Sequence, residues 1–230
     1  MNRQLLNKCL NINHTCPLCD IAPANRYGVC NDCELDLPYL QQGCARCALP
    51  GRGGADGLCS ECRDSPPCFD KVLAGFNYRF PLPQLIHRVK TSRDPEPLYW
   101  LSYLLAKFID QRLDPVSTLI PVPMHSWDQT LRGFNQSELI SRRLAKLLRL
   151  KHQPRLLQKL QRTPHQARLN RTERKANLQN CYALSDDIPK RVALVDDVMT
   201  TGTTVERLSA LLINAGCEKV DVVVLCRTPG

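Results

Sequence analysis

Two adjacent carboxylates, Asp196 and Asp197, stand between an apolar run, residues 192–195, and a hydroxyl-rich turn. The turn consists of Thr200, Thr201, Gly202, Thr203 and Thr204. Its backbone N–H groups, its hydroxyls and the positive end of a helix starting there would cradle a phosphate dianion. The acidic pair suits donor-rich groups such as vicinal ribose hydroxyls, and a divalent metal can screen its charge. These residue types therefore predict a site for a phosphorylated sugar.

The elements around this stretch read as strand, loop and helix. The short apolar run suits a central parallel strand buried on both faces, and ligands bind at the carboxyl ends of such strands. Residues 205–212 have an amphipathic helical pattern, and Thr203 with Glu206 fits a capping box at the start of that helix. Two alternatives stay open: a purely structural turn, or an acidic pair of the kind found in phosphoacceptor domains and nucleotide triphosphatases.

The thirteen-residue run 192–204 resembles the signature loop of the type I phosphoribosyltransferases, which bind 5-phosphoribosyl-1-pyrophosphate (PRPP). The resemblance implies that Asp196 and Asp197 hold the ribose 2′- and 3′-hydroxyls. It implies that the 5′-phosphate is bound by Thr200, Thr201, Gly202, Thr203 and Thr204. It also implies Mg²⁺ on the pyrophosphate group of the ligand.

Four Cys-x2-Cys knuckles lie within 47 residues near the N-terminus, and they indicate metal binding. The first cysteine set is Cys16, Cys19, Cys30 and Cys33; the second cysteine set is Cys44, Cys47, Cys59 and Cys62. The spacing predicts two closed, structural zinc sites that supply folding energy to a segment with few core residues. An iron–sulfur cluster and an interleaved pairing of the knuckles are the less favoured alternatives.

A second motif follows the predicted strand 116–123, which ends in Pro121-Val122-Pro123. In the loop after it, Gly133 would let the backbone approach an anion, and Arg132 can pair bidentately with phosphate oxygens. With Phe134, Asn135 and Gln136, these residues resemble the pattern of the ComF/GntX competence family, whose members join a zinc module to a phosphoribosyltransferase-like domain. That resemblance makes Arg132 the candidate contact for pyrophosphate, with an ordinary surface arginine as the alternative.

Basic charge is concentrated in residues 142–175, named here the basic segment. It contains twelve Lys or Arg and one acidic residue, Glu173, whereas the whole chain has a net charge of +9. Residues 161–175 fall where phosphoribosyltransferases carry a loop that closes over PRPP. Alternatively the segment binds the backbone of single-stranded DNA, or it is only a solvated basic face.

The fold predicted for the chain is an α/β type I phosphoribosyltransferase fold, a mainly parallel sheet flanked by helices, behind an N-terminal double zinc ribbon. Consecutive prolines at positions 66 and 67 suggest a zinc module at 1–67 and a phosphoribosyltransferase-like domain at 68–230. Strands are expected at 71–78, around Leu156 and Ala183, and at 220–225, with helices at 84–90, 96–112 and 137–150. His87 beside Arg88 and Lys90 reads as a solvated basic face rather than a ligand cluster, and no catalytic role is expected of it.

The start of the chain lacks the apolar segment of a secretory signal, and its longest largely apolar stretch, residues 98–109, contains Lys107 and is too short to span a bilayer. A cytoplasmic protein without membrane insertion is expected. The family resemblance implies handling of imported DNA, in transformation or in nutrient use, with single-stranded DNA and DNA-uptake or DNA-processing proteins as partners. The alternative is an active Mg²⁺-dependent phosphoribosyltransferase with an acceptor that the sequence does not identify.

Overall fold

The computed structural model describes residues 15–51, 53–160, 181–185 and 187–229. The chain divides into two compact units, Met1–Leu37 and Pro38–Gly230. The smaller unit contains helix α2 (Asn31–Leu35) and a bridge between Thr15 and Pro23. The second cysteine set lies in the larger unit together with the sheet. The functional division at residues 67 and 68 stays a prediction.

Five parallel strands form the central sheet of the larger unit, in the order β1-β7-β6-β2-β3. They are β1 (Lys71–Asn77), β7 (Lys219–Arg227), β6 (Arg191–Met199), β2 (Thr118–Pro121) and β3 (Lys151–His152). The central strands β6 and β7 are buried along most of their length, as their β-branched apolar runs require. The predicted parallel α/β sheet is confirmed.

Two of the predicted strands do not join this sheet. Strand β4 (Leu157–Lys159) pairs antiparallel with β5 (Tyr182–Leu184) in a separate two-stranded ribbon. The place beside β2 is taken by Lys151 and His152, which follow the preceding helix directly. In β4 the exposed Gln158 follows the buried Leu157, an alternation that suits a ribbon with one face in solvent.

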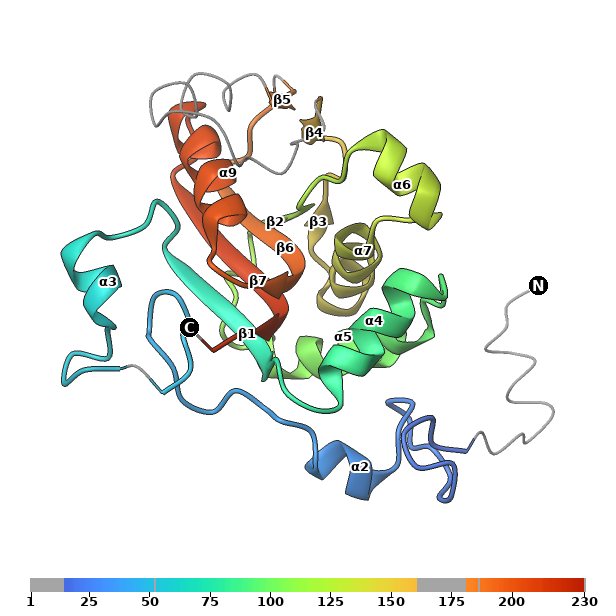
Figure 1. Cartoon of the computed structure of the whole chain (residues 1–230). Helices are drawn as coiled ribbons and strands as arrows, with labels where there is room; N and C mark the ends of the chain where they lie inside the picture. Colours follow the sequence, from blue (N-terminus) through green and yellow to red (C-terminus); the bar gives the residue numbers. More distant parts are fainter. Residues whose placement is uncertain (1–14, 52, 161–180, 186, 230) are drawn as a thin grey trace, which may run out of the picture. The chain divides into compact units, whose positions relative to one another are not determined.

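Helices cover both faces of the sheet (Figure 1). Helix α9 (Thr203–Asn214) contributes Val205, Leu208 and Leu212 to a core cluster that also contains apolar residues of the two central strands: Val192, Leu194 and Met199 of β6, and Val220, Val222 and Val224 of β7. Helices α5 (Glu96–Ile109) and α7 (Gln136–Leu148) pack against each other, and Figure 1 shows them on the other side of the sheet from α9. The other helices in the described part of the larger unit are α3 (Ser60–Asp64), α4 (Leu82–Thr91) and α6 (Ser126–Arg132). None of the helices that the structure describes is long and apolar enough to cross a membrane.

The second cysteine set belongs to the core on the α9 face. All four of its cysteines are buried in the same cluster as Met199 and Val205, which flank the predicted phosphate-binding turn. Backbone hydrogen bonds join the segment to β1, from Val72 N to Arg46 O at 2.8 Å and from Leu40 N to Gly75 O at 3.0 Å. This set is therefore packed into the larger unit.

Candidate functional site

The acidic pair lies near the carboxyl end of β6, where the predicted ligand site requires it. Ser137 Oγ donates a hydrogen bond of 2.7 Å to Asp196 Oδ1, and the backbone N–H of Asp197 donates another of 2.9 Å to the same atom. Burial, and then the neighbouring Asp197 carboxylate, raise the pKa of Asp196 to about 7, against the lowering effect of the Ser137 hydrogen bond. Near neutral pH this carboxyl is therefore poised between its two protonation states.

Asp197 is paired with a cation from a distant helix. Lys90 Nζ, on α4, lies 2.7 Å from Asp197 Oδ2, and the N–H of Val198 donates to Asp197 Oδ1 at 2.7 Å. Asp197 itself is buried, with 8% of its surface exposed. The interpretation of Lys90 as part of a solvated basic face was wrong, because it supplies the positive charge beside the acidic pair.

The residues after β2 shape the opposite wall of the site. Helix α6 occupies part of this loop and ends at Gly133, which has a left-handed φ of 85°. Asn135 caps α7 by accepting a hydrogen bond from Ser137 N at 3.0 Å, and its Nδ2 donates to Val122 O at 3.0 Å. Asn135 thus ties the start of α7 to the end of β2 and brings Ser137 against Asp196.

A cavity of about 560 Å³, named here the main cavity, brings these groups together. The predicted residues Asp196, Asp197, Arg132 and Thr204 line it. Other charged or hydroxyl side chains that line it were not predicted from the sequence: Lys90, Asp128, Ser137, Lys159, Tyr182 and Arg207. Acceptors for hydroxyl groups and cations for phosphate oxygens therefore share one cavity.

The threonine loop, residues 200–204, turns at Gly202, which adopts a φ of 79° and precedes the first residue of α9. This left-handed φ favours glycine, and a Cβ built at this position would lie 2.5 Å from Met199 Cε, so the flexible end of the Met199 side chain would have to move as well. The hydroxyls of Thr201 and Thr203 are 2.9 Å apart, and both residues are exposed. Thr201, Gly202 and Thr203 line a second cavity of about 270 Å³ rather than the main one.

The predicted capping box is absent, because the N-cap position of α9 is occupied by Gly202, which has no side chain, and Thr203 is already the first residue of the helix. Instead of reaching back to the helix start, the Glu206 carboxylate accepts hydrogen bonds from Cys68 N at 3.0 and 3.2 Å. This long-range contact gives the carboxylate a backbone donor outside its own helix. It also joins the first turn of α9 to the segment that follows the second cysteine set.

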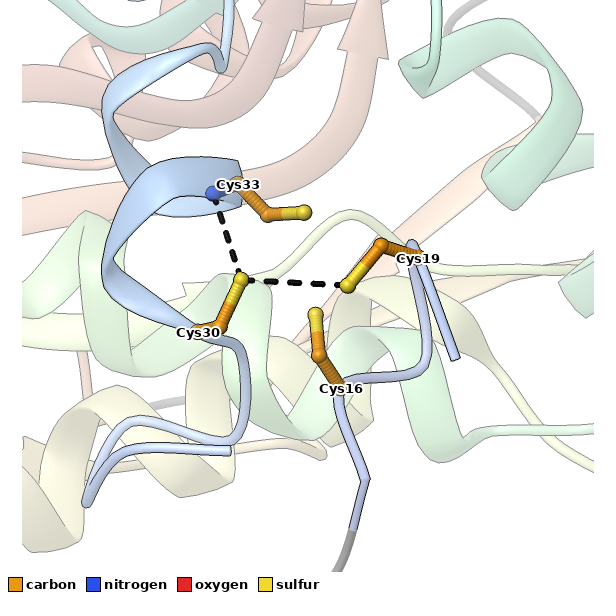
Figure 2. Close-up of side chains that lie close together, drawn as sticks. All are labelled: Cys16, Cys19, Cys30 and Cys33. Atoms are coloured by element: carbon orange, nitrogen blue, oxygen red, sulfur yellow. Dashed lines mark hydrogen bonds between the residues drawn. The ribbon is translucent and has the colours of Figure 1, made fainter. Parts of the chain in front are cut away.

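The eight knuckle cysteines form two groups in sequence order, and within each group the sulfur atoms all lie within 4.8 Å of one another. Figure 2 shows the side chains of the first set converging, with 3.9 Å between the sulfurs of Cys19 and Cys30. In the second set the sulfurs of Cys47 and Cys59 are 3.7 Å apart. Tetrahedral zinc with Zn–S bonds of about 2.3 Å needs sulfurs about 3.8 Å apart, so both groups fit the ion.

The surroundings of the thiols in the second cysteine set act on their pKa values in opposite directions. Although burial acts to raise it, backbone hydrogen bonds from Cys47, Cys59 and Arg46 lower the pKa of Cys44 to about 6. In the same set, burial and the neighbouring sulfurs of Cys47 and Cys59 raise the pKa of Cys62. A divalent cation would offset this repulsion between thiolates.

Part of the basic segment is described, and it reaches the site. Arg142, Lys146, Arg149, Lys151 and Arg155 are exposed. Arg142, Arg155 and Lys159 line a further cavity of about 620 Å³, which shares Pro123, Met124, Asn135 and Lys159 with the main cavity. Residues 161–175, expected to close over the ligand, lie outside the described residues.

Comparisons with known proteins find one matching family model and several similar chains. The model of the phosphoribosyl transferase domain matches residues 144–230. The chain is 31% identical over 228 residues to the DNA utilization protein YhgH of Salmonella typhi, covering 95% of this chain and 99% of that protein. It is 31% identical to competence protein F of Haemophilus influenzae, covering 87% and 90%, and 26% identical to competence protein ComFC of Streptococcus pneumoniae, covering 86% and 87%.

The ion pair between Lys90 and Asp197 predicts a stability loss that depends on pH. Lys90→Met should lower the free energy of unfolding by on the order of 1–2 kcal/mol at pH 8, between the values for exposed and buried pairs. At pH 5 the loss should be smaller, because Asp196, with its pKa of about 7, is then protonated and one carboxylate fewer needs compensation. Urea denaturation at both pH values measures the difference.

Lys90→Arg is the matched control, since it keeps the positive charge and should retain most of the stability at both pH values. An equal loss for Lys90→Met at pH 5 and pH 8 would contradict the role assigned to the charge.

Proposed function

The chain belongs to the ComF/GntX competence family, and we propose that it binds PRPP with Mg²⁺ at the acidic pair and the threonine loop while it acts in the handling of imported DNA. One observation carries the proposal. The acidic pair and Thr204, the last residue of the threonine loop, line the same cavity as Arg132, Lys159 and Arg207. Neutral hydroxyls and anionic phosphates would each meet complementary groups there.

The polar groups of the main cavity and of the threonine loop beside it suggest how the ligand would be oriented. Asp196 and Asp197 offer carboxylate oxygens to the ribose 2′- and 3′-hydroxyls, and the exposed threonine loop offers N–H and hydroxyl donors to the 5′-phosphate. Arg132 would contact the pyrophosphate. Mg²⁺, when bound, would neutralise part of the negative charge of the pyrophosphate.

Handling of DNA is suggested by the names of the relatives and by the described part of the basic segment. Five exposed Lys or Arg side chains between residues 142 and 155 can neutralise phosphates of a single strand and release counterions. We assign the protein to the cytoplasm, where the two cysteine sets would hold structural zinc. DNA-uptake or DNA-processing proteins are the proposed partners.

A second candidate function is phosphoribosyl transfer itself. The cavity of about 620 Å³ that shares four lining residues with the main cavity provides space for an acceptor beside the ribose. Catalysis would then depend chiefly on holding acceptor and ribose in line, which the fixed positions of Asp196 and Ser137 would support. Release of pyrophosphate on addition of an acceptor would distinguish this activity from binding alone.

Calorimetric titration of the zinc-loaded protein with PRPP and Mg²⁺ tests the ligand site. The wild type should bind one equivalent, and the Asp196→Asn, Asp197→Asn double variant should lose at least about a hundredfold in affinity, since two charged hydrogen-bond acceptors are removed. Glu218→Gln is the matched control, because it is an exposed acid paired with Lys190 away from the cavity. A wild type that does not bind, or a double variant that binds equally well, would refute the site.

Single-stranded DNA affinity should fall by about a hundredfold or more between about 50 and 200 mM salt if several phosphates are contacted. Arg142→Gln with Arg155→Gln should weaken binding and flatten this salt dependence. The pair Lys190→Gln with Arg191→Gln removes the same charge at the start of β6 and should have little effect. Fluorescence anisotropy with a labelled oligonucleotide measures both, and binding insensitive to salt would exclude the basic segment as the DNA surface.

A further inference from the structure

Arg227, the last residue of β7, is buried with 5% of its surface exposed, yet its acceptors in the described chain are all main-chain carbonyls. Nε donates to Cys47 O at 3.1 Å, and Nη1 donates to Met199 O at 3.2 Å and Thr228 O at 3.1 Å. A short hydrogen bond joins Nη1 to Thr200 O. Burying a charged guanidinium with only neutral carbonyls as partners costs free energy. A contribution to folding stability therefore does not explain why arginine occupies this position.

The positions of the acceptors supply that reason. Cys47 is a member of the second cysteine set, whereas Met199 and Thr200 lead into the threonine loop. One planar guanidinium therefore bridges a metal-binding knuckle and the loop proposed to bind phosphate. Its fixed fork geometry sets the spacing of the two backbones, which a flexible ammonium would not do.

Two further features join the same parts of the molecule. The contact between Glu206 and Cys68 N connects α9 to the chain that leaves the second cysteine set. The second cavity, of about 270 Å³, is lined from one side of this junction by Cys47 and Cys62 and from the other by Thr201, Gly202 and Thr203. The knuckle and the threonine loop thus form one packed junction through Arg227.

We propose that Arg227 is a positioning residue that couples the metal state of the second cysteine set to the shape of the threonine loop. A knuckle without its ion loses the constraint that fixes its backbone, including the Cys47 carbonyl. The guanidinium then loses one anchor and holds the Thr200 carbonyl less firmly. The coupling acts in both directions, so a ligand on the loop should in turn stabilise the metal in this set.

The first test needs no sugar ligand. Hydrogen–deuterium exchange of the peptide spanning residues 199–206 should speed up by about tenfold when zinc is removed from the second cysteine set by Cys44→Ser, while peptides from β2, which β7 and β6 separate from β1, stay protected. In Arg227→Met the loop should exchange rapidly already in the zinc-loaded protein, and Arg227→Lys should recover part of the protection. The inference would be overturned if the loop exchanged at the same rate with and without zinc, and at the same rate in the wild type and in Arg227→Met.

The second test rests on the proposed PRPP site. PRPP with Mg²⁺ should slow the loss of one of the two zinc ions to a chromophoric chelator, and the protected ion should be the one retained by a Cys16→Ser, Cys19→Ser variant. In Arg227→Met the zinc content should stay unchanged, while the protection disappears and PRPP affinity falls about tenfold.

The outcomes separate the two proposals. A wild type that does not bind PRPP refutes the proposed function, and the exchange experiment then decides the role of Arg227 alone. A wild type that binds PRPP without protecting either zinc ion would overturn the coupling. If Arg227→Met does not fold, Arg227→Lys and the wild-type protection measurement still give the answer.

Discussion

The parallel pairing of β6 with β7 is the constraint on which the site depends. Its register places Asp196 beside Val224 and Met199 beside Arg227, so both strands end at the same edge of the sheet. Because side chains alternate along buried strands, apolar residues fill the core up to the point where the carboxylates begin. The acidic pair, the threonine loop and the Arg227 guanidinium then meet within a few residues of two strand ends.

Placing charge at the end of a buried strand is expensive, and the structure offsets the cost with groups from distant segments. Ser137 from α7 and Lys90 from α4 hold the two carboxylates, and main-chain carbonyls hold the guanidinium of Arg227. Each partner comes from an element already packed on the sheet, so the site is organised before any ligand arrives. Such preorganisation would lower the cost of binding the proposed sugar phosphate.

The local features were predictable, whereas the long-range contacts were not. The apolar run before Asp196 and the hydroxyl-rich turn after it predict strand, loop and helix, and Cys-x2-Cys spacing predicts which thiols can meet. Lys90 is separated from Asp197 by more than a hundred residues, and no periodicity in its helix indicates that pairing. The sequence predicts that Glu206 caps the start of its own helix, whereas in the structure its carboxylate accepts a hydrogen bond from the backbone N–H of Cys68. The short strand at Lys151 displaced the predicted one for a similar reason, because tertiary pairing overrides local propensity.

The central claim is that the ends of β6 and β7 form a site that binds PRPP, in a protein that acts in the handling of imported DNA. A crystal structure of the zinc-loaded chain with PRPP and Mg²⁺ tests it most directly. The account predicts the ribose hydroxyls on Asp196 and Asp197, the 5′-phosphate on the N–H groups of residues 200–204, and the Cys47 carbonyl still bound by Arg227. Ribose density away from the acidic pair, or a phosphate that leaves the threonine loop empty, would contradict it.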